Sequence, residues 1–369
     1  MITRLLSLVA FWKLSSLRSS TFTDFYTKEN TNGVSNTKVD QVLGEDMCYW
    51  IKNVEFSSLM NNRGMSDYML VSGAIYFKSV LPLRVLIESC MLFNCSSGGI
   101  FFQNFKDGEC VLYKVCGGRC HTEISDMTHG QFGWFQVHDT RRLIIFDVSV
   151  YKCAPSMTDV LNTPIYVQNS FLNMKNVNFS QNNAYQYSGM YMYYPNNYTC
   201  NYTIFADNFV TYSNCLYVYN GGYTARRNFF NCSFLRNNSP NNAVIELYSS
   251  TNDYFTFCLF QKNMNALFKT GGLTLQISFC YIYHTSTLVL SGPVSGYINS
   301  ATTTQEMTYS IFSSYHCDPV NHIPQDVSPC QTLPPAASTC MINISEQSSQ
   351  TLLSVFQLIM SQTSILILQ

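Results

Sequence analysis

A degenerate internal repeat limits the possible folds of this chain more than any other feature of its sequence. The segment Lys52-Asn53-Val54-Glu55-Phe56-Ser57 returns as Lys175-Asn176-Val177-Asn178-Phe179-Ser180, with five of six positions identical. An F-x-x-N unit starts at Phe179, Phe234 and Phe260, and a cysteine precedes the repeated position by two residues at Cys232, Cys258 and Cys280. Such self-similarity is typical of solenoids, in which each unit buries its apolar face against the next.

The spacing of the repeated positions decides between the types of solenoid. We take as anchors one Phe or its equivalent in each coil, at Phe56, Phe93, Val115, Val150, Phe179, Phe209, Phe234, Phe260, Ile282 and Phe312. These lie 22 to 37 residues apart, about 28 on average. Helical repeats keep a fixed length because their helices must stack, whereas a β-solenoid keeps its strand columns and lets its turns vary. The sequence therefore predicts an all-β fold, a single-stranded right-handed parallel β-helix of about ten degenerate coils.

Each unit has the pattern of short strands joined by an asparagine-rich corner. Apolar and polar residues alternate in runs such as 216–219 and 244–248, which is the period of a strand with one buried face. Asn tolerates left-handed backbone angles, and its amide can bond the equivalent amide of the next coil. We therefore expect ladders of stacked Phe, Cys and Asn along one long axis.

The two ends of the chain depart from the repeat. We expect residues 1–47 to form an N-terminal segment or cap, residues 48–316 the parallel β-helix, and residues 317–369 a proline-rich segment with an apolar tail. The mostly apolar run 5–12 after one basic residue has a signal-like pattern, which an ordinary first strand would share. The uncharged stretch 352–369 fits either a capping element or a membrane-associated tail.

The composition permits an extracellular location without demonstrating it. Charged residues make up 12% of the chain and its net charge is −1, so no basic surface selects nucleic acid. The 15 cysteines are either buried core thiols or are partly joined in disulfides. N-x-S/T sequons start at Asn94, Asn178, Asn197, Asn201, Asn231, Asn237 and Asn343. We expect a secreted or cell-surface protein, with an intracellular location as the alternative.

The repeat units resemble those of known β-helix proteins. An F-x-x-N unit paired with Gly98-Gly99-Ile100 or Gly73-Ala74-Ile75 resembles the repeats of chlamydial polymorphic outer-membrane proteins. The Cys-containing strands with Asn-rich corners are also similar to β-helix surface proteins of trichomonad protozoa. The resemblance covers about residues 48–315. It implies the pectin-lyase-like superfamily, which includes pectinases, adhesins and phage tailspikes, so the fold alone does not select a function.

The acidic residues do not form a recognisable catalytic motif. Glycoside hydrolysis needs two carboxylates flanking the bond, and a uronate lyase needs a base with Ca²⁺-binding carboxylates. The 22 acids are instead scattered along the chain. Glu123, Asp126 and Asp147 with Arg141 and Arg142 form the best candidate cluster, which we interpret as solvated loops. We therefore expect no catalytic residue.

One short run has the residue types of a metal site. Cys116-Gly117-Gly118-Arg119-Cys120-His121, together with Cys110, could supply zinc ligands. No second ligand pair stands nearby in the sequence, so we interpret these residues as disulfide-bonded or loop thiols. We therefore expect no metal and no cofactor.

Tyrosine density is the one feature that suggests a binding surface. Alternate tyrosines in neighbouring runs would line one outer face of a solenoid, at Tyr191, Tyr193, Tyr217, Tyr219 and Tyr248. Such a face suits sugar-ring stacking or protein contact. The alternative is that tyrosine is only the solvent-side strand former of these coils.

These observations favour a non-catalytic β-helix surface or secreted protein, which acts in adhesion or ligand display through its outer face. The expected partners are a carbohydrate or a host or cell-surface protein, not nucleic acid, with membrane association through the apolar tail as a further interpretation. The alternative function is a polysaccharide lyase or glycoside hydrolase of the same fold.

Overall fold

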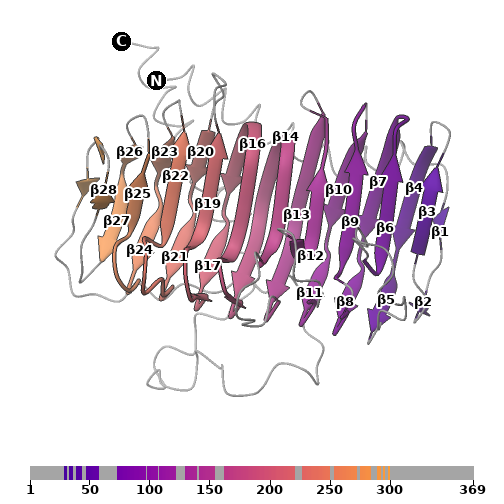
Figure 1. Ribbon diagram of the computed structural model, residues 1–369, viewed down its shortest axis with the longest axis horizontal. Coiled ribbons are helices and arrows are strands. Elements are labelled where there is room, and N and C mark those ends of the chain that lie inside the picture. The colour runs from indigo at the N-terminus through magenta and orange to yellow at the C-terminus, as the bar shows by residue number, and fades with distance from the viewer. Residues whose placement is uncertain are drawn as a thin grey trace, which may run out of the picture. The chain divides into compact units, whose positions relative to one another are not determined.

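The computed structural model describes residues 29–299 with gaps, chiefly at 58–72, 122–128, 154–161, 221–226, 250–252, 272–274 and 284–288. Every regular element within this part is a β-strand, and all paired strands are parallel (Figure 1). The chain divides into residues 1–318 and 319–369, and every described residue lies in the first unit. The predicted all-β fold with stacked parallel strands, a right-handed β-solenoid, is confirmed.

Three columns of strands follow one another in each coil. The first column contains β1 (Glu29–Asn30), β4 (Met47–Lys52), β7 (Leu83–Glu88), β10 (Glu109–Tyr113), the start of β13 (Arg142–Tyr151), the middle of β14 (Asn162–Ser180), the end of β16 (Tyr187–Asn201), β20 (Arg227–Phe230), β23 (Tyr254–Thr256), β26 (Leu275–Ser278) and β29 (Val294–Ser295). Strands β1 to β3 therefore lie within residues 1–47 and pair with the coil that follows.

The second column follows the first along the chain in each coil. It contains β2 (Gly33–Ser35), β5 (Val54–Ser57), β8 (Met91–Phe93), β11 (Cys116–Gly118), the ends of β13 and β14, β17 (Ile204–Ala206), β21 (Ser233–Leu235), β24 (Leu259–Gln261), β27 (Cys280–Tyr283) and β30 (Ile298–Asn299).

The third column carries the candidate binding face. It contains β3 (Val39–Leu43), β6 (Ile75–Ser79), β9 (Ile100–Asn104), β12 (His129–Gln136), the starts of β14 and β16, β19 (Asn214–Asn220), β22 (Ile245–Ser249), β25 (Phe268–Thr270) and β28 (Val289–Ser291). A separate pair, β15 (Asn183–Ala184) with β18 (Phe209–Val210), lies between the second and third columns in sequence.

Corners with left-handed backbone flank the strands of the second column where the structure describes the adjoining residues. The first corner precedes the strand and has a positive φ at Asn53, Ser89, Lys114, Asp147, Asn176, Tyr202, Asn231, Phe257 and Phe279. The second corner follows it, with a positive φ at Asn94, Arg119, Lys152, Gln181, Asp207, Arg236 and Lys262. The sequence predicted Asn at such corners, but most of these residues are of other types. Because each lies between in-register strands, the coil rather than its own preference fixes its backbone.

Of the nine predicted anchors that the structure describes, six are right, including Phe56 and Val150, and three are wrong. Phe179, Phe234, Phe260 and Ile282 lie in register as predicted. The coil between Phe179 and Phe234 contributes Phe205, not Phe209. Phe209 belongs to β18 and is 37% exposed, so it cannot be a core anchor. Phe312 lies outside the described residues.

Two N-terminal anchors are also shifted. Leu92 occupies the position predicted for Phe93, because alternation turns the half-buried Phe93 away from the core. Gly117 occupies the position predicted for Val115. A Cβ atom on Gly117 would lie 2.0 Å from Cδ2 of Phe132, so the Phe132 ring from the third column takes the place of an anchor side chain.

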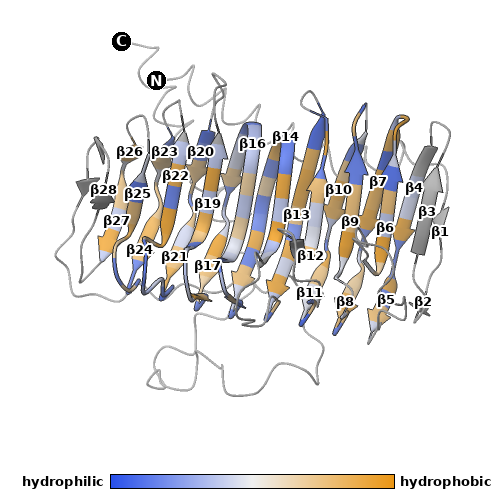
Figure 2. Cartoon of the chain, viewed as in Figure 1, coloured by the Kyte–Doolittle hydropathy of each residue, from blue (hydrophilic) through white to orange (hydrophobic). Residues whose placement is uncertain are grey.

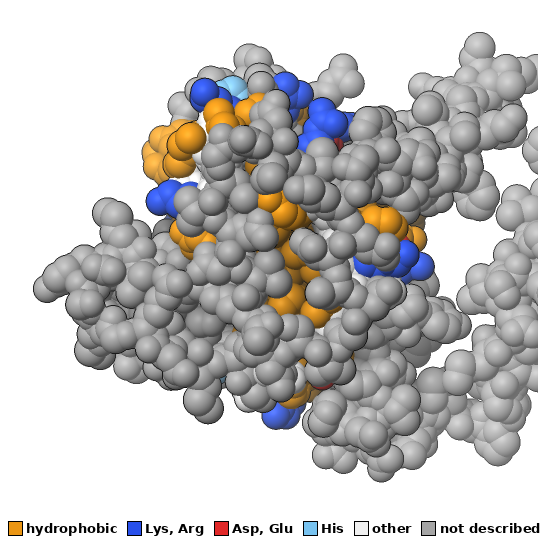
Figure 3. All heavy atoms as spheres, turned by 90° about the vertical axis from the view of Figure 1, so that its right-hand side faces the viewer, with side chains coloured by type: hydrophobic (Ala, Val, Ile, Leu, Met, Phe, Trp, Pro, Cys, Tyr) orange, Lys and Arg blue, Asp and Glu red, His pale blue; other side chains and the backbone are white. Residues whose placement is uncertain are grey.

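Stacked aromatic rings form the core of the C-terminal coils. Successive ring centroids in the stack of Phe179, Phe205, Phe234 and Phe260 lie 4.8, 4.8 and 5.3 Å apart, with interplanar angles of at most 12°. All four rings are fully buried, so burial and stacking act together. Apolar and polar residues alternate along most strands (Figure 2). In the view onto the end that carries β1, hydrophobic side chains run through the middle and Lys and Arg lie near the periphery (Figure 3).

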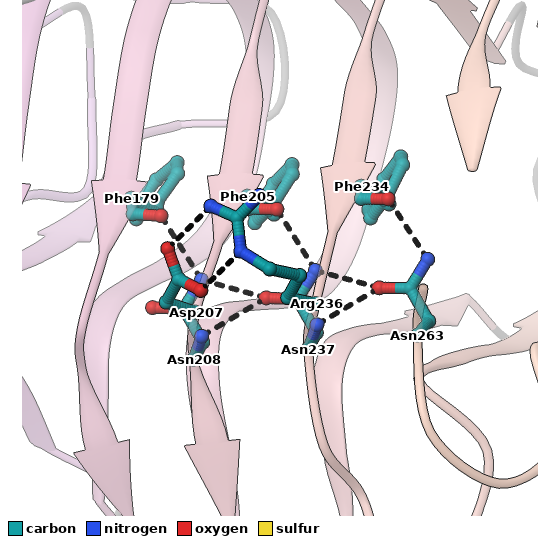
Figure 4. A network of polar contacts seen from close by, with 8 residues as sticks. All are labelled: Phe179, Phe205, Asp207, Asn208, Phe234, Arg236, Asn237 and Asn263. Carbon is teal, nitrogen blue, oxygen red and sulfur yellow. Dashed lines mark hydrogen bonds and ion pairs between the residues drawn. The ribbon is translucent and has the colours of Figure 1, made fainter. Parts of the chain in front are cut away.

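An asparagine ladder runs beside these rings. Asn182, Asn208, Asn237 and Asn263 each follow an anchor by three residues, and each is at most 1% exposed. The Oδ1 atom of Asn237 accepts hydrogen bonds from the backbone N and the Nδ2 of Asn208, at 3.1 and 3.0 Å. Its Nδ2 donates to the carbonyl oxygen of Phe205 at 2.8 Å and to Oδ1 of Asn263 at 3.0 Å (Figure 4). The predicted asparagine ladder is therefore confirmed.

Cysteine continues the same position in the N-terminal direction. Cys95, Cys120 and Cys153 each follow their anchor by three residues, and all three are fully buried. The backbone N of Cys153 donates to Oδ1 of Asn182 at 2.8 Å, which joins the cysteine run to the asparagine ladder. Ten described cysteines are free and buried, while Cys116 is disulfide-bonded. Of the two interpretations of the cysteines, core thiols therefore account for these ten.

We expect the ten free thiols to resist alkylation in the native protein. Burial raises the pKa of Cys90 and of Cys215 to about 12, so little thiolate forms at neutral pH. Cys280 should react first among them, because a hydrogen bond with Cys258 lowers its pKa. Timed iodoacetamide labelling followed by peptide mass spectrometry checks this order, with the guanidinium-unfolded chain as the fully reactive control. Early labelling of Cys90 or Cys215 would contradict it.

The sequons fall in different environments. Asn237 is in the ladder and Asn178 is 7% exposed, so a glycan on either would require the coil to open. Asn94 is exposed, and Asn197, Asn201 and Asn231 are half-buried. Asn343 lies outside the described residues, as does the apolar tail 352–369. The described part of the chain contains no helix with the length and apolar character needed to cross a membrane.

Candidate binding face

The five predicted site tyrosines lie on one outward face of the third column. Tyr191 and Tyr193 on β16 are in register with Tyr217 and Tyr219 on β19, and Tyr219 is in register with Tyr248 on β22. Their neighbours Met190, Met192, Leu216, Val218 and Leu247 are buried in the core. Because side chains alternate between the two sides of a strand, the tyrosines all point outward. We call this set the tyrosine face.

Three of these rings form a regular stack. The centroid of Tyr219 lies 5.4 Å from that of Tyr193 and 5.2 Å from that of Tyr248, with interplanar angles of 11° and 6°. Tyr248 ends the stack and is 46% exposed. Gly271 is the next residue in that row, and a Cβ atom there would lie 2.2 Å from Cδ2 of Tyr248. The absence of a side chain at Gly271 therefore makes room for the terminal ring.

The second row is more closely interlocked. The centroids of Tyr191 and Tyr217 are 5.2 Å apart with tilted rings, and Tyr187 lies 4.7 Å from Tyr191 and 5.2 Å from Tyr217. Tyr194 meets Tyr193 and Tyr219 edge-on. Tyr187 and Tyr194 are therefore part of the face, although the prediction did not include them.

This second row continues toward the N-terminus as a longer aromatic stack that the sequence reading missed. Tyr76, Phe101, Trp134 and Tyr166 occupy the same register, with centroids 4.8, 4.6 and 5.7 Å apart. Tyr166 then meets Tyr191 edge-on at 5.2 Å. A single aromatic residue in each of these runs looks unremarkable by itself. Only the register of the third column reveals the row.

In the row that contains Tyr193, Tyr219 and Tyr248, the earlier coils carry glutamines. Gln103, Gln136 and Gln168 are in register with Tyr193, and Nε2 of Gln103 donates to Oε1 of Gln136 at 2.9 Å. The hydroxyl group of Tyr166 donates to Oε1 of Gln168 at 3.4 Å. Along this row the side chains therefore change from amides in the N-terminal coils to phenols in the later coils, without a break in register.

The tyrosine face is electrically neutral. Burial raises the pKa of Tyr217, and Glu246 raises it further. The same two causes raise the pKa of Tyr187 to about 12. Glu246 and Lys269 follow Tyr217 in the second row, and Oε1 of Glu246 pairs with Nζ of Lys269 at 2.9 Å. The phenols of Tyr187 and Tyr217 therefore stay protonated at neutral pH and can both donate and accept hydrogen bonds.

The stacking determines what this face can contact. Neighbouring rings cover most of the ring faces in this set, so few of those faces are open to a ligand. A sugar ring stacks on an open aromatic face, which the face offers mainly at Tyr248. A protein surface can use edges and hydroxyl groups together.

The acids and cysteines considered for chemistry are held in other contacts. Oε1 of Glu109 pairs with Nε of Arg142 at 3.0 Å, and Asp147 accepts a hydrogen bond from Asn176 at 2.8 Å. Glu123 and Asp126 lie outside the described residues. Cys110 and Cys120 are core residues, so they do not form a loop site with Cys116. Within the described ranges, no three His, Cys, Asp or Glu side chains are grouped to hold a metal ion.

A buried polar cluster that the sequence analysis did not predict lies inside the solenoid. Arg227 is fully buried, and its Nη1 lies 3.8 Å from Oδ1 of Asp253. The hydroxyl group of Tyr198 donates to the same oxygen at 2.8 Å. Burial raises the pKa of Asp253 to about 6, and Arg227 and Tyr198 only partly oppose this effect. A single buried carboxylate such as that of Asp253 has no sequence signal that separates it from a surface acid.

Comparison of the chain with protein-family models, with curated proteins and with solved structures gave no match.

Proposed function

We propose that this protein is a non-catalytic binding protein that contacts a protein on another surface through its tyrosine face. The observation that carries the proposal is the continuous set of outward tyrosines on β16, β19 and β22, held rigid by stacking and free of net charge. Tyrosine supplies a large amphipathic contact area and loses little side-chain entropy on binding. A rigid, neutral face of this kind suits recognition by shape and hydrogen bonding.

The architecture supports the same proposal. A β-solenoid presents its outer side chains at fixed intervals of about 4.8 Å along its axis. The repeats resemble those of chlamydial polymorphic outer-membrane proteins and trichomonad β-helix surface proteins, and relatedness to the pectin-lyase-like superfamily is part of this proposal. A secreted or cell-surface location and a role in adhesion or display complete it. The proposed partner is a cell-surface protein. The test below distinguishes this partner from a glycan bound at Tyr248.

We expect the purified chain to bind intact cells and protein arrays, and Tyr193→Thr/Tyr219→Thr/Tyr248→Thr to lose at least about tenfold in affinity, as removal of a central aromatic cluster usually does. Threonine keeps the β-propensity of these positions, so the coils should still form. Surface plasmon resonance against the captured partner, beside a glycan array, gives the measurement.

The matched control is Tyr212→Thr. Tyr212 is 60% exposed and lies outside the tyrosine face, so its replacement should leave binding unchanged. Loss of binding upon protease treatment of the cells supports a protein partner. Binding to isolated glycans that depends on Tyr248 alone would replace the protein partner by a carbohydrate. Equal binding by the triple variant and its parent would refute the role of this face.

A further inference from the structure

Three phenylalanines form an exposed ridge at the first corner of the last described coils. Phe230, Phe257 and Phe279 are 36%, 51% and 58% exposed. The ring centroids of Phe257 and Phe279 are 5.2 Å apart and stacked, and Phe230 meets Phe257 edge-on at 5.5 Å. We call these three residues the phenylalanine ridge. It lies between the first and second columns, whereas the tyrosine face belongs to the third.

Besides exposing apolar surface, two of these residues have a strained backbone. Phe257 and Phe279 have φ values of 54°, in the left-handed region that bulky residues avoid. Equivalent corner positions in other coils carry Asn53, Asn176 and Asn231, and Asn tolerates this backbone best after glycine. The ridge therefore combines backbone strain with exposed apolar surface, where the fold accepts a small polar residue. Such a combination points to a function.

Beside three other corners, a cation covers an aromatic ring. Nζ of Lys114 lies 5.0 Å from the ring centroid of Tyr113, and Nζ of Lys152 lies 5.0 Å from that of Tyr151. The guanidinium of Arg119 similarly lies 5.6 Å from the ring of Phe93. In each case the left-handed residue is a cation; Lys114 and Lys152 cover the ring just before them, and Arg119 covers the ring of Phe93 in the previous coil. At the phenylalanine ridge the left-handed residue is itself an uncharged ring.

We propose that the phenylalanine ridge inserts into the interfacial region of a lipid bilayer. The three exposed fractions correspond to roughly 300 Å² of ring surface. A stable dimer buries about 800 Å² on each partner, so the ridge is too small to hold a second copy of the chain by itself. Insertion into lipid has no such minimum, and a projecting corner enters a deformable interface more easily than it fits a rigid surface.

The chemistry of the ridge also sets the lipid preference. The last residue of the preceding first-column strand and the residue after each ridge corner are uncharged, at Thr256, Cys258, Ser278 and Cys280. Binding should therefore be weak, reversible and similar on zwitterionic and anionic bilayers, and no stronger than that of one acyl chain. It holds the molecule against a membrane independently of what the tyrosine face contacts.

The test uses Phe257→Asn/Phe279→Asn in the full chain. Because Asn suits the left-handed corner, this variant should unfold at the same denaturant concentration as its parent or a higher one. Flotation with phosphatidylcholine vesicles, at about 1 mM lipid, should recover the parent chain and leave at least about fivefold less of the variant with the vesicles. The control is Phe209→Asn, since Phe209 is 37% exposed and lies outside the ridge.

Each other result overturns the proposal. If the parent chain does not float, the ridge does not bind lipid. If the variant floats as well as its parent, another part of the chain binds the vesicles. If vesicle-free ultracentrifugation shows a dimer that the variant loses, the ridge is an interface between copies. A strong preference for phosphatidylserine would instead indicate a charged surface.

Discussion

Replacement of Asn237 by alanine is expected to lower the free energy of unfolding by about 3–5 kcal/mol, because several buried polar groups lose their partners at once. The backbone N–H and Nδ2 of Asn208 lose their acceptor, and the carbonyl of Phe205 loses its donor. None of these groups can reach water, since Asn208 and Asn237 are at most 1% exposed. Urea denaturation followed by circular dichroism measures the loss.

The neighbouring residue provides the control for this variant. Asn238 is half-buried, and its Oδ1 accepts only a long 3.4 Å hydrogen bond from the exposed Asn265. Asn238→Ala should therefore change the stability by less than about 0.5 kcal/mol. If both variants lose the same amount, the ladder adds nothing beyond ordinary surface contacts. The ladder account would then be wrong.

The buried Asp253 should make the protein less stable as the pH rises from about 4 to about 6. Burial raises the pKa of Asp253 to about 6 in the folded chain from the ordinary 3.8, so the folded chain keeps a proton that the unfolded chain has released. The stabilisation is complete below the unfolded pKa and is lost as the pH passes through the folded pKa. Its size is on the order of 3 kcal/mol.

Asp253→Asn isolates this contribution. The amide keeps the acceptor for the Tyr198 hydroxyl group but does not titrate, so the stability of the variant relative to its parent should rise between pH 4 and pH 6. Arg227→Met should move the decline of the parent curve to higher pH, because Arg227 lowers the pKa of Asp253. Denaturation curves at closely spaced pH values give both measurements. A constant difference between Asp253→Asn and its parent would contradict the assignment.

The architecture was predictable because one spacing is repeated more strictly than the residues themselves. Phe179, Phe234 and Phe260 each precede Asn by three residues, and this unit placed them correctly. Phe205 precedes Asn208 by the same interval, so the signal that would have replaced Phe209 was present. In the N-terminal coils cysteine takes the place of Asn, which hides the same interval. The exchange of Gly117 and Phe132 was not predictable, because it links two columns across a β-bulge.

The binding face was predictable only in part for the same reason. Tyr191, Tyr193, Tyr217 and Tyr219 lie in dense alternating runs, so period-two reasoning found them. Trp134 and Phe101 join the same row only through the register of distant strands. Arg227 begins β20 on the inward side, two residues before Phe229, a place where sequence reasoning expects an apolar side chain.

The backbone geometry of the left-handed corners is nearly constant, whereas the side chains that they present to the outside vary. Lysine, arginine, aspartate, glutamine, tyrosine and phenylalanine all occupy these corners with nearly the same φ, so the scaffold tolerates wide chemical variety there. A lineage of such molecules could exchange its outward chemistry one coil at a time while the internal ladders stay in place. The same property would let an engineer graft charges, haptens or epitopes at intervals of about 4.8 Å on a stiff rod.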